Sequence, residues 1–174
     1  PKPNRYYDNY GNKDEVNFYT KASHKVTDKL NLFADLQYRM VFYDATSVKF
    51  DDVNDMFRFF NPKAGLNYQL DAKNAFYGYF GIANKEPRRD DYESGAIKPE
   101  RLFDYELGWK YNTKKVKLYA NAFYMRYNDQ LVMTGALNDV GSPIFTNSGK
   151  SYRLGLEVES TIAITDKLIL NPNI

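Results

Sequence analysis

A period-two pattern across residues 29–43, with one apolar face and one mostly polar face, constrains the fold of this chain more than any other feature of the sequence. A strand of about thirteen residues rises roughly 40 Å, and at a tilt of about 40° it crosses a hydrocarbon core of about 30 Å. The segment therefore predicts one strand of a transmembrane β-barrel, with apolar side chains toward lipid and polar ones toward the lumen. The apolar face carries Leu30, Leu32, Ala34, Leu36, Tyr38, Met40 and Phe42.

The composition combines many aromatic residues with a polar average. The 16 Tyr, 12 Phe and 1 Trp make up 17% of the 174 residues, yet the mean hydropathy is only -0.64. A barrel accounts for both values, because its aromatic residues gather in interfacial girdles while its lumen and loops are polar. The absence of cysteine excludes disulfides and thiolate metal sites. The net charge of +2 favours no nucleic-acid surface.

The same alternation predicts an all-β chain of about eight antiparallel strands, joined in turn by short turns and long loops. Because short turns of outer-membrane barrels face the periplasm, the long loops are expected outside. Pro62 interrupts one strand and predicts a bulge or an unpaired position there, since proline cannot donate to a ladder. The predicted strands are 15–23, 29–43, 56–70, 75–84, 102–111, 116–132, 151–164 and one from 168; the predicted loops are 1–12, 44–55, 85–101 and 133–149.

A family resemblance rests on five segments that follow one another in this order. They are FFNPKAGLNYQL (59–70), FGIANKEPRRDDY (80–92), KPERLFDYELGWKY (98–111), ANAFYMRYNDQLV (120–132) and SYRLGLEVE (151–159). Together they resemble the middle to C-terminal barrel of TonB-dependent outer-membrane receptors. The resemblance covers nearly all of the chain from residue 57 onward.

This resemblance implies an up-and-down transmembrane barrel of roughly 22 strands around a plug. Such receptors import iron-siderophores, haem, cobalamin or glycans with energy passed on by TonB. Residues 1–174 would be a sector of that barrel domain and an internal piece of a longer precursor, with the plug and the TonB-contacting N-terminal segment outside this chain. The expected partners are the TonB complex, the plug, the lipid bilayer and a small ligand, in the outer membrane of a Gram-negative bacterium. We expect a transporter with no catalytic residues, no cofactor and no metal site.

By the same resemblance, one charged loop faces the ligand pocket. Arginine suits an anionic ligand, because the donors of its guanidinium form a fixed fork. The plainer interpretation is a solvated loop with mutual salt bridges, each worth at most about 1 kcal/mol when exposed. The candidate ligand-binding residues are Glu86, Arg88, Arg89, Asp90 and Asp91.

Polar positions of the alternating strands predict the lumen lining. Two carboxylate pairs at i, i+2, Asp104 with Glu106 and Glu157 with Glu159, each share a strand face. Paired carboxylates serve glycoside hydrolysis, but lumen lining or plug contact fits these positions better. The predicted lumen-facing residues are Asp35, Gln37, Arg39, Lys63, Asn67, Asp104, Glu106, Asn121, Arg153 and Glu157.

Two other polar features carry weaker hypotheses. The oxygen-bearing residues of the 44–55 loop, Asp51, Asp52, Asn54 and Asp55, have ligand types that suit calcium but not the spacing of an EF-hand. His24 is the only histidine and cannot build a His-rich zinc site alone. Two other functions stay open from the sequence: a passive barrel of about eight strands, complete in itself, and a soluble carbohydrate-binding β-protein. The outward aromatic residues could also form the core of a soluble β-sandwich, which would give similar periodicity.

Overall fold

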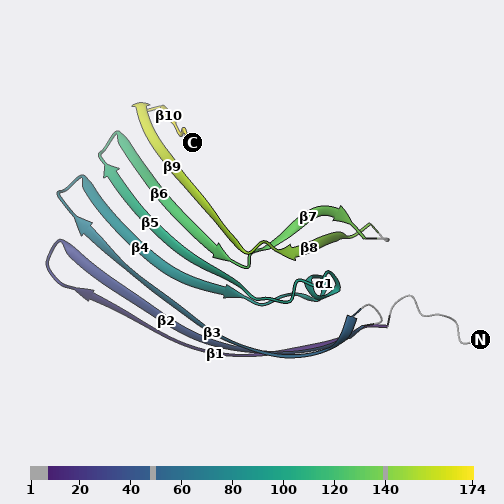
Figure 1. Ribbon diagram of the computed structural model, residues 1–174. Helices are drawn as coiled ribbons and strands as arrows, with labels where there is room; N and C mark the ends of the chain where they lie inside the picture. The colour runs from purple at the N-terminus through teal and green to yellow at the C-terminus, as the bar shows by residue number, and fades with distance from the viewer. Residues whose placement is uncertain (1–7, 48–49, 139–140) are drawn as a thin grey trace, which may run out of the picture.

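The computed structural model describes residues 8–47, 50–138 and 141–174, and these form an eight-stranded antiparallel sheet with a separate two-stranded hairpin (Figure 1). The large sheet has the order β1-β2-β3-β4-β5-β6-β9-β10, and β7 pairs with β8. The elements are β1 Tyr10–Lys25, β2 Leu30–Ser47, β3 Phe50–Gln69, β4 Asn74–Lys85, α1 Arg89–Glu93, β5 Glu100–Asn112, β6 Val116–Asn128, β7 Leu131–Leu137, β8 Pro143–Asn147, β9 Lys150–Thr165 and β10 Leu168–Leu170.

The predicted all-β, up-and-down arrangement is confirmed. Consecutive strands pair as antiparallel hairpins from β1 to β6, and β9 then pairs with β6. The short turns lie together at one end of the sheet, whereas α1 and the β7–β8 hairpin lie at the other (Figure 1). Among the described residues the sheet is open, with β1 and β10 at its edges. A complete eight-stranded barrel or a two-layer sandwich is therefore not what these strands form.

All four predicted loops contain regular structure that the alternation did not reveal. Most of 44–55 belongs to β2 and β3, which pair out to Ser47↔Phe50, while residues 48–49 lie outside the described part. Loop 85–101 contains α1, and loop 133–149 contains most of the β7–β8 hairpin, with residues 139–140 outside the described part. The prediction for 1–12 is also wrong from Tyr10 onward, where β1 begins, and residues 1–7 are not described. Polar sequences can extend paired strands, because ladder hydrogen bonds need no apolar side chain.

The strand registers divide the side chains of the sheet between two faces. Asp35, Lys63 and Asp104 lie level with one another across β2–β5 and therefore share one face of the sheet. We call this face the inner face. The opposite, outer face carries apolar residues such as Leu36, which is 44% exposed. No helix of the described residues is long and apolar enough to cross a membrane.

The ladder of hydrogen bonds between β3 and β4 ends next to Pro62, which confirms the predicted unpaired position. The pairing of these strands stops at Lys63↔Gly81, although β2 and β3 remain in register through Leu36↔Pro62. Beyond this point two asparagines replace the ladder. The backbone N–H of Asn84 donates to Asn61 Oδ1 at 3.1 Å, and Asn84 Nδ2 donates to the carbonyl of Phe60 at 3.2 Å.

Aromatic rings on the inner face lie over glycines, which lets the side chains pack closely across the sheet. A Cβ at Gly108 would overlap the ring of Tyr77, and one at Gly155 would overlap that of Phe123. Such ring-over-glycine pairs help to pin the register of neighbouring strands.

Candidate functional site

The loop between β4 and β5 lies against the inner face and contributes several of the buried residues. Pro87, Asp91, Tyr92 and Ala96 of this loop are buried. The ring of Tyr92 stacks on Tyr43 of β2 with centroids 5.7 Å apart, and its hydroxyl donates to Asp55 of β3. The β4–β5 loop is therefore fixed to the extended β2–β3 hairpin rather than free in solvent.

Glu86 at the start of this loop joins three segments through ion pairs. Its carboxylate pairs with Arg39 Nη2 at 2.5 Å and with Lys13 Nζ, and Arg39 also contacts Glu15 Oε2 at 3.3 Å. Burial favours the neutral acid, but the hydrogen bond from Lys13 and the charge of Arg39 outweigh it and hold the pKa of Glu86 below its usual range. The Glu86 carboxylate therefore stays ionised near neutral pH. We define Lys13, Glu15, Arg39 and Glu86 as the Glu86 cluster.

Asp91 caps the short helix α1. Its Oδ2 accepts the backbone N–H of Arg88 at 2.7 Å, while its fully buried Oδ1 has no hydrogen-bond partner among the described residues. The Arg88 guanidinium is 59% exposed and lies over the ring of Phe145 in β8, 5.4 Å from its centroid. These contacts place α1 beside the β7–β8 hairpin.

The five predicted ligand-binding residues thus divide into two groups. Glu86 and Asp91 are buried and structural, with partners inside the protein. Arg88, Arg89 and Asp90 are exposed, and Arg89 pairs with Asp90 at 3.3 Å and with Glu93 at 3.7 Å. The interpretation as a solvated loop with mutual salt bridges fits Arg88, Arg89 and Asp90, and Arg88 Nε also lies 3.5 Å from Asp91 Oδ2. It does not fit Glu86, because its partners come from β1 and β2.

All of the predicted lumen-facing residues lie on the inner face by register. Asp35 pairs with Lys21 of β1 at 3.4 Å, Gln37 accepts Asn61 Nδ2 at 2.9 Å, and Arg153 lies over the ring of Tyr127. The Asp104 carboxylate keeps its Oδ1 without a hydrogen-bond partner among the described residues.

A tyrosine cluster in the middle of the inner face was not predicted. The rings of Tyr77 and Tyr119 stack with centroids 6.0 Å apart, and their hydroxyls are hydrogen-bonded to each other. The Tyr77 hydroxyl also contacts Asn121 Oδ1 at 2.8 Å and Glu106 Oε2 at 3.3 Å, and Lys110 Nζ lies over both rings. Strand β4 is apolar on both faces in sequence, which hid the polar role of Tyr77. The position of Tyr119 opposite Lys110 could have signalled the cluster only if the strand pairing were known.

The structure also locates the residues of the calcium hypothesis and the single histidine. Asp51, Asp52, Asn54 and Asp55 all lie in β3, where Asn54 bonds Asp44 and Asp55 accepts from Tyr92. No group of three or more His, Asp or Glu side chains that could hold a metal ion occurs within residues 8–47, 50–138 and 141–174. His24 is exposed near the end of β1, opposite Leu32.

The fold of the sheet is similar to parts of several larger solved structures. It is similar to the copper transporter OprC, with a TM-score of 0.79, 14% identity and coverage of 94% of this chain and 28% of that one. For the FrpB iron transporter from Neisseria meningitidis (F5-1 variant) the TM-score is 0.72, with 21% identity and coverage of 94% and 26%. For the ferric yersiniabactin uptake receptor FyuA from Yersinia pestis it is 0.70, with 20% identity and coverage of 95% and 26%.

The chain spans about a quarter of the length of these solved structures. At this level of identity the likeness shows the fold alone. A sequence comparison with curated proteins finds no match.

The model of the TonB dependent receptor-like β-barrel family, in contrast, matches residues 1–172. Together with the open, up-and-down sheet and its short and long connections, this match shows that the chain belongs to the TonB-dependent receptor β-barrel family.

Proposed function

We propose that these strands form a sector of the barrel wall of an outer-membrane receptor that binds a scarce ligand with its long loops and imports it with TonB-coupled energy. The inner face lines the lumen, and the outer face contacts lipid. The receptor acts as a transporter, and its chemistry is recognition rather than catalysis. The protein lies in the outer membrane of a Gram-negative bacterium as a multi-pass barrel.

The observation that carries this proposal is the folded β4–β5 loop on the inner face. A barrel wall needs no such loop for its own closure. Here the loop is fixed by the Glu86 cluster and by Tyr92, and α1 begins immediately after the exposed Arg88. Rigid anchoring lowers the entropy cost of ordering a binding loop when ligand arrives. The loop is therefore built as part of a ligand-binding mouth.

The exposed arginines favour an anionic group on the ligand. Arg88 is preorganised by its position over Phe145, and Arg89 is 51% exposed despite its acidic neighbours. The two guanidiniums can each form paired hydrogen bonds with a carboxylate or phosphate. Iron-siderophore complexes, haem and cobalamin carry such groups, which ranks them above neutral glycans for this receptor.

The middle of the inner face is suited to contact the plug. The Tyr77–Tyr119 cluster, the Asp104–Glu106 pair and Lys110 border a cavity of about 400 Å³ with mixed polar and apolar walls. The unpartnered Asp104 Oδ1 needs a donor that these strands do not supply. A polar segment of the plug that fills the lumen satisfies that need.

Uptake by cells that produce the full-length receptor tests the proposal. We would measure accumulation of a labelled ferric siderophore, haem, cobalamin and an oligosaccharide, with and without TonB. One class should accumulate, and its accumulation should stop without TonB. Accumulation that is equal without TonB would instead establish a passive barrel.

Binding to the purified full-length receptor tests the role of the loop. Arg88→Gln combined with Arg89→Gln should weaken binding of the transported ligand at least severalfold. Lys167→Gln, in the short turn between β9 and β10, is the matched control and should leave binding unchanged. Equal affinities for all three proteins would exclude the arginines from the ligand site.

A further inference from the structure

A basic patch lies on the outer face at the end of the sheet that carries the long loops. We define the basic outer patch as Arg101 of β5, Arg126 of β6 and Lys150 of β9. The registers bring them together, because Asn128 stands opposite both Arg101 and Lys150, and Arg126 stands opposite Phe103. All three cations are exposed.

The cations of this patch have no acidic partner within the described part of the chain. None of them takes part in an ion pair there, and Asp129, the acid that follows β6, is paired with Lys98 at 3.8 Å. Instead, the guanidiniums of Arg101 and Arg126 lie over the same ring of Phe103, at 5.1 and 6.0 Å from its centroid. Two like charges on one ring repel each other, so this arrangement calls for an anion from outside the chain.

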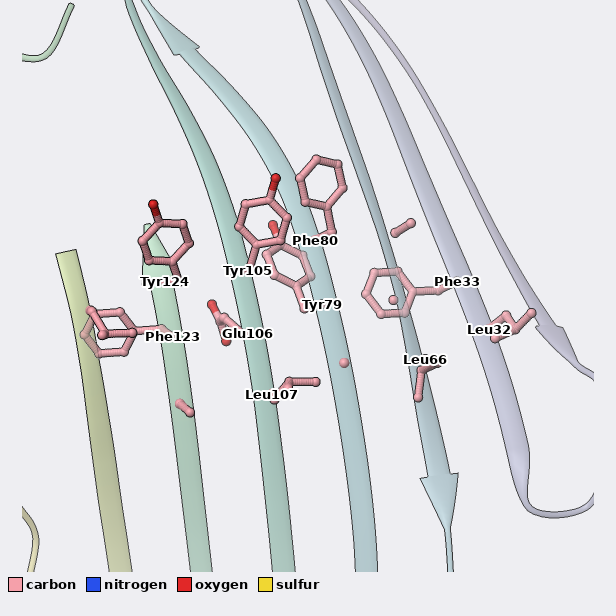
Figure 2. Close-up of a pocket in the computed structure, with 15 residues that line it drawn as sticks. Leu32, Phe33, Leu66, Tyr79, Phe80, Tyr105, Glu106, Leu107, Phe123 and Tyr124 are labelled. Carbon is pink, nitrogen blue, oxygen red and sulfur yellow. The ribbon is translucent and has the colours of Figure 1, made fainter. Parts of the chain in front are cut away.

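An apolar groove continues from the patch along the outer face. Its volume is about 730 Å³, and Gly78, Ala64 and Ala122 leave space between larger side chains. Tyr105 and Tyr124 lie at one end and Leu66 and Leu107 at the other (Figure 2). Tyr124, which lines the groove, and Arg126 are two residues apart on one strand and share its outer face, so Arg126 is the next outer-face residue beyond that end of the groove.

Aromatic residues mark the boundary between groove and patch. Phe80, Tyr105, Tyr124 and Tyr152 form a continuous row across β4, β5, β6 and β9, with successive ring centroids 4.9, 6.1 and 6.0 Å apart. Such rows sit at the level of lipid headgroups in transmembrane barrels. Cations just beyond the row are therefore level with headgroup phosphates, and the groove is level with acyl chains.

We propose that the basic outer patch and its groove bind a phosphorylated lipid of the leaflet on the long-loop side. Arg101, Arg126 and Lys150 hold the phosphate, and an acyl chain lies in the groove beside Gly78. This inference rests on the proposed placement of the outer face in a membrane. The groove and the charges select a phosphorylated lipid over free phosphate, because only the lipid occupies both.

Lipid selectivity of the full-length receptor tests the proposal. The receptor would be reconstituted in phosphatidylcholine vesicles with a trace of spin-labelled phosphatidic acid or spin-labelled phosphatidylcholine, and the immobilised fraction of each label measured. The wild type should immobilise phosphatidic acid preferentially. Arg101→Gln and Arg126→Gln should each reduce that preference about fivefold, the factor that corresponds to about 1 kcal/mol per basic residue.

Arg153→Gln is the matched control, because Arg153 is next to Tyr152 in β9 but lies on the inner face over Tyr127. This variant should keep the wild-type preference. Equal preference in the wild type and the Arg101→Gln, Arg126→Gln double variant would overturn the proposal. Displacement of the labelled lipid by inorganic phosphate alone would also overturn it, since the site would then be an anion site without a lipid.

A separate readout distinguishes failure of this inference from failure of the membrane placement. A spin label at Leu107, which is 70% exposed on the outer face, should be accessible to oxygen and shielded from a water-soluble nickel complex. With that result and no lipid preference, only the lipid site is wrong. A label open to the nickel complex would refute the membrane placement itself and the lipid site with it.

Discussion

The two faces of the same eight strands are stabilised in different ways. On the outer face, large apolar side chains such as Leu36 and Leu107 remain exposed and have few partners within the protein. On the inner face, several charges have partners within the protein and rings cover glycines, as for Lys21 with Asp35 and Tyr77 with Gly108. The stability of the outer face thus depends on the medium that surrounds it, whereas the stability of the inner face depends on specific contacts between side chains. Substitutions on the two faces should therefore differ in kind as well as in size.

The largest difference is expected from adding a charge at neighbouring positions of β2. Leu36→Arg should lower the free energy of unfolding by about 2 to 4 kcal/mol, because a cation near the bilayer midplane loses its hydration. Gln37→Arg should cost much less, since its side chain points to the polar inner face beside Asn61. Denaturant titration of the full-length receptor in lipid vesicles measures both. Equal costs would contradict the assignment of the two faces.

Glu86→Gln should have the next largest effect, on the loop rather than on the sheet. The variant removes the charged acceptor of Lys13 and Arg39, and hydrogen bonds to charged groups are worth about 1.5 to 3 kcal/mol. Hydrogen exchange should report faster exchange in α1 and at Tyr92, with the middle of β2 unchanged. Slow exchange throughout the loop would show that Tyr92 holds it without Glu86.

Acid should have the same effect as this substitution. Because the folded-state pKa of Glu86 lies below the ordinary value of 4.5, its contribution to stability is complete above pH 4.5. The contribution is lost as the pH falls through the lowered folded-state pKa. Protection factors of the loop amides, which correct for the intrinsic pH dependence of exchange, should therefore fall below pH 4.5 in the wild type but much less in Glu86→Gln.

Two glycines of the same sheet give a smaller and cleaner comparison between the faces. Gly108→Ala would place a Cβ within the ring of Tyr77 and should cost about 1 to 3 kcal/mol as overpacking. Gly78→Ala is the control, because the nearest atom to its added Cβ is Leu107 Cδ2 at an ordinary 3.6 Å. Thermal unfolding of both variants provides the measurement. A cost at Gly78 as large as that at Gly108 would argue against ring-over-glycine packing as an inner-face feature.

The smallest effect is expected from the exposed ion pair of the inner face. Lys21 is 69% exposed and pairs with Asp35 at 3.4 Å. Lys21→Gln should therefore change the free energy of unfolding by at most about 1 kcal/mol. A double-mutant cycle with Asp35→Asn isolates the pair, and a coupling clearly above that value would mean that the lumen screens charges less than water does.

Much of the sheet was predictable from sequence, because period-two alternation is a local property that assigns each side chain to a face. The alternation in residues 29–43, the short turns and the break at Pro62 all follow from neighbouring residues alone. The Tyr77–Tyr119 cluster did not follow, since those residues lie on strands separated by β5 and meet only through the register. The five candidate ligand residues do lie together between β4 and β5, but which of them are buried was not predictable.

The sequence by itself thus determined the strand class, the order of turns and loops, and the residues that share each strand face, because backbone geometry couples these to spacing along the chain. Only the tertiary structure decided that the β4–β5 loop folds onto β2 and β3 and that Glu86 pairs with Lys13 and Arg39. It alone also brought Arg101, Arg126 and Lys150 together. These contacts join residues far apart in the chain, and their energies depend on pairing and burial that no local pattern encodes.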